Sequence, residues 1–546
     1  MRVTLRSSLI AGVFTLGCGA ESGAGHLATA GTTGDSGGTS SGGSNGTGGS
    51  ATGSVGEASG SRVFSGTASM LFDGPSCSHE PGATGDRWCG FVALSSTDTR
   101  NLFVVNVSQV AAGVAVSCGP PDPNCLLLTP SLGGDNLDPT FHSTLFQGDT
   151  LIYYDSSLTP YVWRPGMTSG RLLASASPTL DVIFCRAADQ GTAVACLGLP
   201  SAQAEPGIVR GDLLFGKADG AGEPLLGAID EVIIANVADR GGIARFSYGF
   251  PPIAGDYLAW TSRRTSDGPE VLKLQQADDA ASQLTVASDV HGFQVSADGT
   301  QWFWLSAIDD IGVGMLQTAP FPDGASPSDV QASVIEFGVA PTGGREVVTI
   351  SQLGELRAIA EPTLAPSTQL ALDDKVQKLL SFTDKGHVAY IKHFVGTTLS
   401  DLFVANLDGS GVCAVDTTTN VPFVSLHFSP DAESAIWALA KGERFDGLHT
   451  RLSDCSTTSL ASDVAALAWL GQETVLFMDD FDADTGKGSI RFRNLANGKL
   501  LEPAAPTLVA NHADTYAISG PEPGSLLYTV NGGGDADGVY IRWFGP

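Results

Sequence analysis

Short stretches of alternating apolar and polar residues dominate the chain beyond residue 62, and stretches with helical periodicity are almost absent. Three stretches share one pattern and begin at Val295, Ser381 and His427: VSADGTQWFWLS, SFTDKGHVAYIK and HFSPDAESAIWAL. In each, an apolar segment leads into a turn around an aspartate, and a strand-like stretch rich in β-branched and aromatic residues follows. Aspartate accepts backbone N–H groups in turns and glycine adopts positive φ, so the pattern predicts two strands joined by a turn. We therefore expect an all-β fold.

The spacing of these turns distinguishes between all-β architectures. The ASDV tetrapeptide at 287–290 returns at 461–464, which is about four steps of 43 residues. Four-stranded propeller blades repeat at about this length, whereas sandwich domains would repeat near about 100 residues. The repeat length therefore favours a β-propeller.

Turn signals lie near residues 90, 149, 189, 256, 298, 343, 384, 431, 473 and 522, and those near 189, 343 and 522 are the weakest. Residues 190–250 contain more chain than one blade needs, and we interpret the excess as an inserted loop or hairpin. We expect a single propeller over residues 63–546 with about eight four-stranded blades, within a range of seven to ten. The C-terminal GVYIRWFGP is expected to share a blade with SRVFSGTASMLF at 61–72 and so to close the ring.

The turn sequences resemble a known family. The run Ser429–Pro430–Asp431–Ala432 is similar to the Ser-Pro-Asp-Gly turn of TolB-type propeller repeats, and Ser296–Ala297–Asp298–Gly299 matches it at three of four positions. The repeat-turn residues are Asp256, Asp298, Gly299, Asp384, Gly386 and Asp431. No Trp-Asp dipeptide occurs, which separates the chain from ordinary WD repeats. The resemblance implies a protein-binding platform of the cell envelope. Some members of the family carry a separate hydrolase domain, which this sequence does not show.

The N-terminal residues 1–18, MRVTLRSSLIAGVFTLGC, have the pattern of a secretory signal, with a basic start and a short apolar core. The end resembles a bacterial lipobox, which implies lipid on Cys18 and delivery to the outer membrane or cell surface; the alternative is a signal peptide cut nearby. Residues 19–62 are rich in Gly, Ser and Thr and predict a flexible tether. Ser36 lies within this tether in GDSGG, a sequence that surrounds the nucleophile of trypsin-like proteases, but no packed scaffold is predicted around it.

Besides Cys18 the chain has eight cysteines, an even number that is typical of disulfide-bonded exported proteins. Their spacing suggests Cys77 with Cys89, Cys118 with Cys125, and Cys185 with Cys196. Cys413 and Cys455 remain, and their separation of 42 residues places them at strand ends in adjacent blades. Buried free thiols are the alternative.

Acidic residues outnumber basic ones by 58 to 29, giving a net charge of −29 at pH 7. Such a surface repels phosphates, so we expect no nucleic-acid partner, and no membrane contact beyond a lipid anchor. We expect a monomer without cofactors. Calcium is the one alternative, because Asp480, Asp482 and Asp484 alternate in DDFDADTGKG; a polar hairpin loop explains the same residues.

Five tryptophans fall on the strands that follow the turns, either as core between blades or as a sugar-stacking surface: Trp260, Trp302, Trp304, Trp437 and Trp469. The sequence leaves three functions open. The first is a non-enzymatic, surface-anchored propeller that binds an envelope protein or glycan, and it is the one we favour. The others are a propeller-type polysaccharide lyase or glycosidase, and a structural component of an envelope assembly.

Overall fold

A computed structural model describes residues 60–71, 76–78, 85–95, 99–119, 121–133, 144–175, 180–188, 192–200, 208–236, 257–262, 269–277, 279–309, 311–340, 346–360, 368–392, 401–416, 423–441, 444–470, 474–482, 487–496, 499–500, 507–519, 525–531 and 535–543. These residues form 38 strands and one five-residue helix, α1 (Val107–Ala111). In this part of the chain, no helix has the length and hydropathy needed to cross a membrane.

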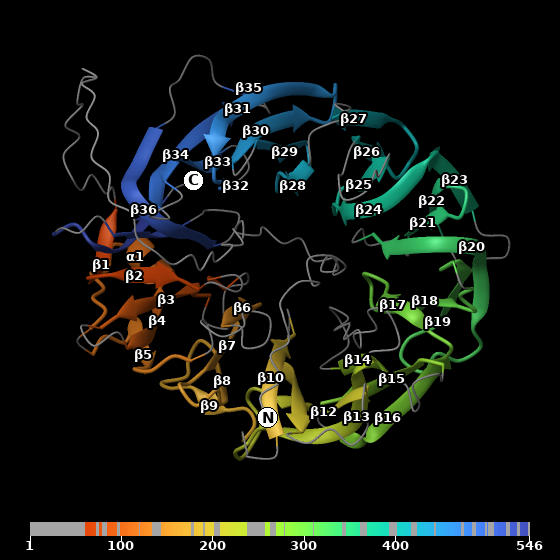
Figure 1. Ribbon diagram of the computed structural model, residues 1–546, viewed down its shortest axis with the longest axis horizontal. Helices are drawn as coiled ribbons and strands as arrows, with labels where there is room; N and C mark the ends of the chain where they lie inside the picture. Colours follow the sequence, from red (N-terminus) through yellow and green to blue (C-terminus); the bar gives the residue numbers. More distant parts are fainter. Residues whose placement is uncertain are drawn as a thin grey trace, which may run out of the picture.

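Antiparallel units of four strands follow one another around a central axis, as expected for a propeller-like fold (Figure 1). The first and second units are β2 (Ala68–Met70), β3 (Trp88–Leu94), β4 (Arg100–Asn106) and β5 (Cys125–Thr129), then β6 (Leu145–Gln147), β7 (Thr150–Tyr154), β8 (Pro160–Trp163) and β9 (Arg171–Leu172). The third unit is β10 (Leu180–Ala187), β11 (Ala193–Pro200), β12 (Ile208–Lys217) and β13 (Leu226–Asn236), and the fourth has three described strands, β14 (Tyr257–Ser262), β15 (Val271–Gln276) and β16 (Asp279–Ser288).

The fifth and sixth units share a strand: β17 (His291–Val295), β18 (Gln301–Ser306), β19 (Gly314–Pro320) and β20 (Ser328–Val339), then β20, β21 (Val347–Ser351), β22 (Leu356–Ala360) and β23 (Thr368–Asp373). The seventh and eighth are β24 (Val376–Phe382), β25 (His387–Lys392), β26 (Leu402–Asn406) and β27 (Val412–Asp416), then β28 (Phe423–Phe428), β29 (Ser434–Lys441), β30 (Arg444–Arg451) and β31 (Ser456–Val464). The ninth and tenth are β32 (Ala466–Trp469), β33 (Thr474–Asp482), β34 (Lys487–Ala496) with β35 (Lys499–Leu500), and β36 (Thr507–Ser519), then β36, β37 (Ser525–Val530), β38 (Gly538–Trp543) and β1 (Ser61–Ser65).

The described strands therefore form ten units, at the upper end of the expected range, and the expected count of about eight is not confirmed. Two of the boundaries between units fall inside single long strands, because each of these strands is the outer strand of one unit and the inner strand of the next. In β20, Ser328 to Val334 pair with β19, and Val334 to Val339 pair with β21. Strand β36 passes from β34 to β37 in the same way.

The expectation of an insertion within residues 190–250 is wrong for its described part. Residues 193–200, 208–217 and 226–236 form β11, β12 and β13, which are three regular strands of the third unit. The strands β12 and β13 are long, at 10 and 11 residues, and they account for part of the extra chain; residues 201–207 and 237–250 lie outside the described residues.

The ring is closed by the two ends of the described chain, as the sequence predicts. The strand β1 pairs with β38, and Figure 1 shows the first and last strands side by side. Ten clusters of buried apolar side chains lie between successive units, and the cluster at the closure joins Phe91 and Phe103 of the first unit to Leu527 and Ile541 of the tenth. Burial of apolar surface between units is the main force that favours this arrangement.

Side chains on the inner strand of one unit form hydrogen bonds to the inner strand of the next unit. Gln147 accepts a hydrogen bond from the Ala187 N–H at 2.6 Å, and Gln294 accepts one from the Val339 N–H at 2.7 Å. Glu336 in turn accepts from the N–H of Leu379 at 3.2 Å, and burial raises the pKa of its carboxyl group. Each of these backbone N–H groups lies at a unit boundary, where it has no hydrogen-bond acceptor in its own sheet. A side chain of the neighbouring unit accepts its hydrogen bond instead.

The ring has two faces. In each unit with four described strands, the second strand begins at one face, here the turn face, and ends at the other, here the hairpin face. In the tenth unit Ser61 pairs with Ile541 and Ser65 pairs with Gly538, so β1 begins at the turn face. The described chain therefore enters the ring at the turn face, and β1 starts two residues before the predicted boundary at 63.

Candidate interaction site at two neighbouring hairpins

Two hairpins on the hairpin face carry the most exposed large apolar side chains among the described residues. Ile311, between β18 and β19, is 70% exposed, and Leu353, between β21 and β22, is 82% exposed. The other exposed large apolar side chains there reach at most 49%. A single exposed aliphatic residue needs no explanation, but two on adjacent hairpins of one face form a candidate contact site.

Val334 brings the bases of the two hairpins together. It is the residue at which β20 passes between units, and it pairs with Gly314 of β19 and with Ser351 of β21. Paired Cα atoms in antiparallel strands lie at most about 5.5 Å apart, so the Cα atoms of Gly314 and Ser351 are separated by about 11 Å at most. The Ser333 carbonyl also accepts a hydrogen bond from the Gln352 N–H at 2.8 Å. We call residues 306–309, 311–314, 333–334 and 351–356 the hairpin site.

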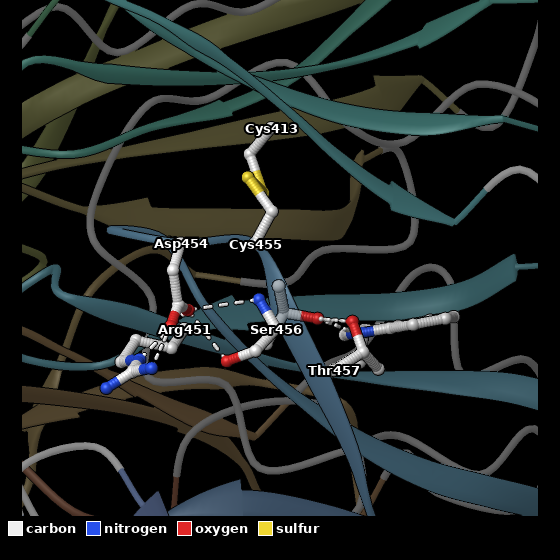
Figure 2. The surroundings of a disulfide bond; sticks show 8 residues. Cys413, Arg451, Asp454, Cys455, Ser456 and Thr457 are labelled. Carbon is white, nitrogen blue, oxygen red and sulfur yellow. Dashed lines mark hydrogen bonds and ion pairs between the residues drawn. A yellow bond between two sulfur atoms is a disulfide. The ribbon is translucent and has the colours of Figure 1, made fainter.

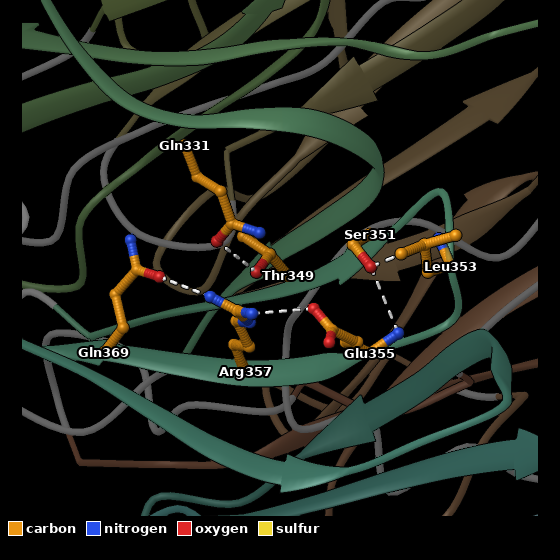
Figure 3. Close-up of polar contacts among 7 residues, drawn as sticks. All are labelled: Gln331, Thr349, Ser351, Leu353, Glu355, Arg357 and Gln369. Carbon is orange, nitrogen blue, oxygen red and sulfur yellow. Dashed lines mark hydrogen bonds and ion pairs between the residues drawn. The ribbon is translucent and has the colours of Figure 1, made fainter.

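Short polar side chains hold both tips. Asp309 Oδ1 accepts hydrogen bonds from the N–H of Ile311 at 3.1 Å and from the N–H of Val313 at 2.9 Å. Ser351 Oγ accepts from the N–H groups of Leu353 at 3.3 Å and Glu355 at 3.2 Å (Figure 3). Such bonds define turn conformations, so the exposed aliphatic side chains are presented from an ordered backbone.

Two separate sets of polar contacts lie next to the second hairpin (Figure 3). Arg357 donates to Glu355 at 2.7 Å and to Gln369 at 2.8 Å, which ties the hairpin to β23. The Thr349 hydroxyl donates to Gln331 at 2.9 Å, from the second strand of the sixth unit to the outer strand of the fifth. The first set ties the hairpin to β23 within its own unit, and the second joins the sixth unit to the fifth.

A half-buried polar cluster lies beside the hairpin site. The Val376 N–H donates to the Gly354 carbonyl at 2.9 Å, which brings the connection between β23 and β24 against the hairpin tip. At the end of β23, Asp373 accepts hydrogen bonds from Lys392 at 2.6 Å and from the Tyr390 hydroxyl. Burial alone would raise the pKa of Asp373, but these two donors outweigh it and hold that pKa below its ordinary value. Burial and the Asp373 carboxylate raise the pKa of Tyr390.

The turn motif found in the sequence forms a compact hydrogen-bonded unit. Ser296 Oγ donates to Asp298 Oδ1 at 2.6 Å and accepts from the Gln301 N–H at 2.9 Å. The Gly299 N–H donates to the Ser296 carbonyl at 2.8 Å, and Gly299 has φ of 68°. The serine hydroxyl is thus the centre of the motif, and the aspartate holds it.

The same bonds recur in the second copy. Ser429 Oγ donates to Asp431 Oδ1 at 2.5 Å, and the Ala432 N–H donates to the Ser429 carbonyl at 2.8 Å. Ala432 takes the place of the glycine and keeps its left-handed backbone, with φ of 56°.

The third copy corrects the role expected for Asp384. Thr383 is the central hydroxyl residue there, because its Oγ1 accepts from the His387 N–H at 3.1 Å, and Gly386 supplies the left-handed position with φ of 84°. Lys385 therefore occupies the position that aspartate has in the other copies, two residues after the hydroxyl residue. Asp384 precedes that position by one residue and is exposed. The sequence comparison aligned the copies on their aspartates, and this alignment hid the one-residue shift of Asp384. Asp256 lies outside the described residues.

The acidic run considered for calcium lies on the hairpin between β33 and β34. Asp480 binds Arg491 at 3.0 Å, and Asp482 is exposed and pairs in register with Lys487. Asp484 lies outside the described residues. Among the residues that the structure describes, no three His, Cys, Asp or Glu side chains gather as metal ligands.

The five tryptophans are part of the core. All are at most 6% exposed: Trp260, Trp302, Trp304, Trp437 and Trp469. Their indole N–H groups are satisfied inside the ring; for example, Trp469 donates to the His427 carbonyl at 3.0 Å across the boundary of the eighth and ninth units. The structure thus agrees with core packing and not with a sugar-stacking surface.

The eight cysteines of the ring form the four disulfides that their spacing suggests. Three lie within the first or third unit: Cys77–Cys89, Cys118–Cys125 and Cys185–Cys196. The fourth, Cys413–Cys455, joins β27 of the seventh unit to the turn before β31 of the eighth, with Cα atoms 5.4 Å apart (Figure 2). It lies beside Arg451, which binds Asp454 in the same turn.

Two predicted features lie outside the described residues, namely the lipidation residue Cys18 and the tether with Ser36. The hairpin site, by contrast, is described but was not predicted. Its sequence signal is an aliphatic residue directly before a turn glycine, in DDIGVG and SQLGEL. Both glycines have positive φ, 83° at Gly312 and 78° at Gly354.

No protein-family model matches the chain, and no curated protein matches it. Solved structures resemble it at low identity. A prolyl endopeptidase is 13% identical with a TM-score of 0.37, and the match covers 71% of this chain and 53% of the peptidase, so the chain spans about half of that protein's length. A eukaryotic initiation factor is 13% identical with a TM-score of 0.44, covering 72% of this chain and 95% of the factor. An oligogalacturonate lyase solved in complex with manganese is 14% identical with a TM-score of 0.31, covering 56% of this chain and 90% of the lyase.

Proposed function

We propose that this chain is a lipid-anchored, non-enzymatic binding protein of the bacterial cell envelope, whose ten units form one TolB-type propeller. Its partner is a protein, which it binds through the hairpin site. The observation that carries this proposal is the pair of exposed aliphatic tips, Ile311 and Leu353, held on ordered hairpins whose bases are joined by Val334.

The exposed chemistry favours a protein over a glycan. Sugar rings are bound by exposed aromatic faces; the five tryptophans of the strand pattern are at most 6% exposed, and Trp543, which is 38% exposed, lies at the turn-face end of β38 and not at the hairpin site. Exposed aliphatic residues with a polar surround are typical of protein contact sites.

The position of the tether suits an anchored platform. Lipid on Cys18 would hold the ring at the outer membrane, and the chain joins the ring at the turn face, opposite the hairpin site. If residues 19–60 behave as the flexible coil that their composition predicts, their root-mean-square reach is about 32–39 Å, which clears the headgroup layer. The four disulfides fit an extracytoplasmic compartment.

Site-specific photocrosslinking in the native envelope tests the binding proposal. A photoreactive residue replaces Ile311 or Leu353, and in matched controls it replaces Leu127 or Val412, which are exposed aliphatic residues on the outer strands β5 and β27. We expect a discrete protein adduct from the two hairpin positions and none from the controls. Glycan adducts alone, or equal labelling at all four positions, would contradict the proposal.

The anchor is tested separately. We expect Cys18→Ser to abolish lipid labelling and to release the protein from membranes, whereas Ser36→Ala should leave both lipid labelling and crosslinking unchanged. Lipid labelling that persists in Cys18→Ser would overturn the proposed lipid anchor. It would not affect the binding proposal, which the crosslinking experiment tests.

A further inference from the structure

Carboxylates surround the exposed aliphatic tips. Asp289 accepts a hydrogen bond from the Ala307 N–H at 2.9 Å, so it lies at the base of the first hairpin, and its side chain is 49% exposed. Asp309 lies in the same hairpin and is exposed. On the other side, the side chains of Glu355 and Asp374 are 42% and 73% exposed.

The cations nearby do not balance these charges. Arg357 is bound to Glu355 at 2.7 Å, and Lys392 is bound to Asp373 at 2.6 Å and lies 4.0 Å from Asp374. Lys375 is the remaining exposed cation in the described residues of the connection after β23. The hairpin site is therefore an aliphatic pair within an acidic surround, on a chain whose net charge is −29.

The charge narrows the class of partner. Anionic lipid headgroups and nucleic acids are repelled by such a surface, and so is a second copy of this chain. Opposite charge at the edge of an interface increases the association rate and excludes wrong partners, while apolar contacts at its centre supply most of the affinity.

Resting on the proposed function, we infer that the hairpin site binds a basic protein segment. Apolar side chains of that segment pack on Ile311 and Leu353, and its lysine or arginine residues lie against Asp309, Asp374 and their acidic neighbours.

The test uses the full chain in phosphatidylcholine nanodiscs, with empty discs as the blank. The probe is a short fluorescent peptide of alternating lysine and leucine, and a glutamate–leucine peptide is its charge control. We expect I311S/L353S to weaken binding of the lysine–leucine peptide about tenfold, because two aliphatic contacts are lost. D309N/D374N should weaken it about threefold and reduce its salt dependence, because asparagine keeps the acceptor oxygen that holds the hairpin but removes the charge.

The matched control is L127S/V412S, which removes two exposed aliphatic residues from the outer rim and should leave binding within about twofold of the wild type. The inference is overturned if I311S/L353S binds the probe like the control, or if the glutamate–leucine peptide binds as tightly. Crosslinking from Ile311 separates this inference from the proposed function. An adduct with an acidic partner segment would keep the binding function and reject the basic partner, whereas absence of any protein adduct would reject both.

Discussion

The Tyr390 hydroxyl donates a hydrogen bond to Asp373 across the boundary between the sixth and seventh units. Lys392 binds the other oxygen of the same carboxylate at 2.6 Å, and its ammonium group lies 4.8 Å from the centre of the Phe403 ring. Asp373 ends the outer strand β23, whereas Tyr390 and Lys392 lie on β25. One carboxylate, bonded at both oxygens, thus joins two units of the ring.

The same arrangement recurs between the third and fourth units. Asp230 on the outer strand β13 accepts hydrogen bonds from Trp260 Nε1 at 2.8 Å and from Lys273 Nζ at 2.7 Å. An acid on an outer strand, together with an aromatic donor and a lysine on the next unit, is common to both sites. Recurrence at two boundaries indicates that these clusters hold units together.

We expect Asp373→Ala to lower the free energy of unfolding by about 2–4 kcal/mol, because it leaves Lys392 and the Tyr390 hydroxyl without their shared acceptor. Tyr390→Phe should cost about 1 kcal/mol, because it removes one hydrogen bond and keeps the packing. Urea denaturation of both variants measures the two losses.

The control for this pair is Asp374→Asn, whose side chain is 73% exposed and whose effect should stay within about 0.5 kcal/mol. Equal stability of Asp373→Ala and Asp374→Asn would show that the cluster does not hold the units together.

The sequence predicted the strands and the turns because both depend on local chemistry. A hydroxyl residue, an aspartate and a glycine form the turn at Ser296 with bonds that span only five residues. Closure by β1 and β38 was also predictable, because both terminal stretches alternate like strands and a propeller needs a partner for its last edge.

The number of units was not predictable because nothing in the local chemistry marks two of the boundaries. At Val334 the chain turns from one unit into the next without leaving the strand, so no polar or glycine-rich connection divides the repeat. The hairpin site was missed for a related reason. Ile311 and Leu353 are 42 residues apart, and only the ring topology shows that their hairpins are neighbours.

Replacing Ala432 tests the turn motif directly. Ala432 has φ of 56°, a region that costs a residue with a Cβ about 1 kcal/mol relative to glycine. We expect Ala432→Gly to raise the free energy of unfolding by about 0.5–1 kcal/mol, and Gly299→Ala at the equivalent position, where φ is 68°, to lower it by a similar amount. Both changes are measured as shifts of the urea midpoint; shifts of the same sign would contradict the equivalence of the two turns.

The disulfide between Cys413 and Cys455 should contribute more to stability than its contacts suggest. It closes a loop between cysteines that are 42 residues apart, and in the chain-entropy description such a loop stabilises the folded state by about 4 kcal/mol. We expect non-reducing peptide mapping to recover the two cysteines as one linked pair, and the C413A/C455A variant to unfold at lower urea. Free thiols at both positions in the native protein would remove this link between the seventh and eighth units.

Acid should weaken the boundary between the eighth and ninth units through His449. This side chain on β30 is 2% exposed, and its ring lies 6.1 Å from that of Trp469 in an edge-to-face contact. Burial, with a smaller contribution from Arg451, lowers the pKa of His449 from 6.5 to about 4. The unfolded chain therefore takes up the proton at higher pH than the folded chain, and stability is lost as the pH falls from about 6.5 towards 4.

Between about pH 7 and pH 4.5 this one group accounts for a loss of about 2–3 kcal/mol. We expect His449→Gln to lower stability at neutral pH, because it disturbs the packing against Trp469, but to flatten the dependence on pH over this interval. Urea midpoints at the two pH values measure both effects. A pH dependence that is as steep in His449→Gln as in the wild type would place the acid-sensitive group elsewhere in the ring.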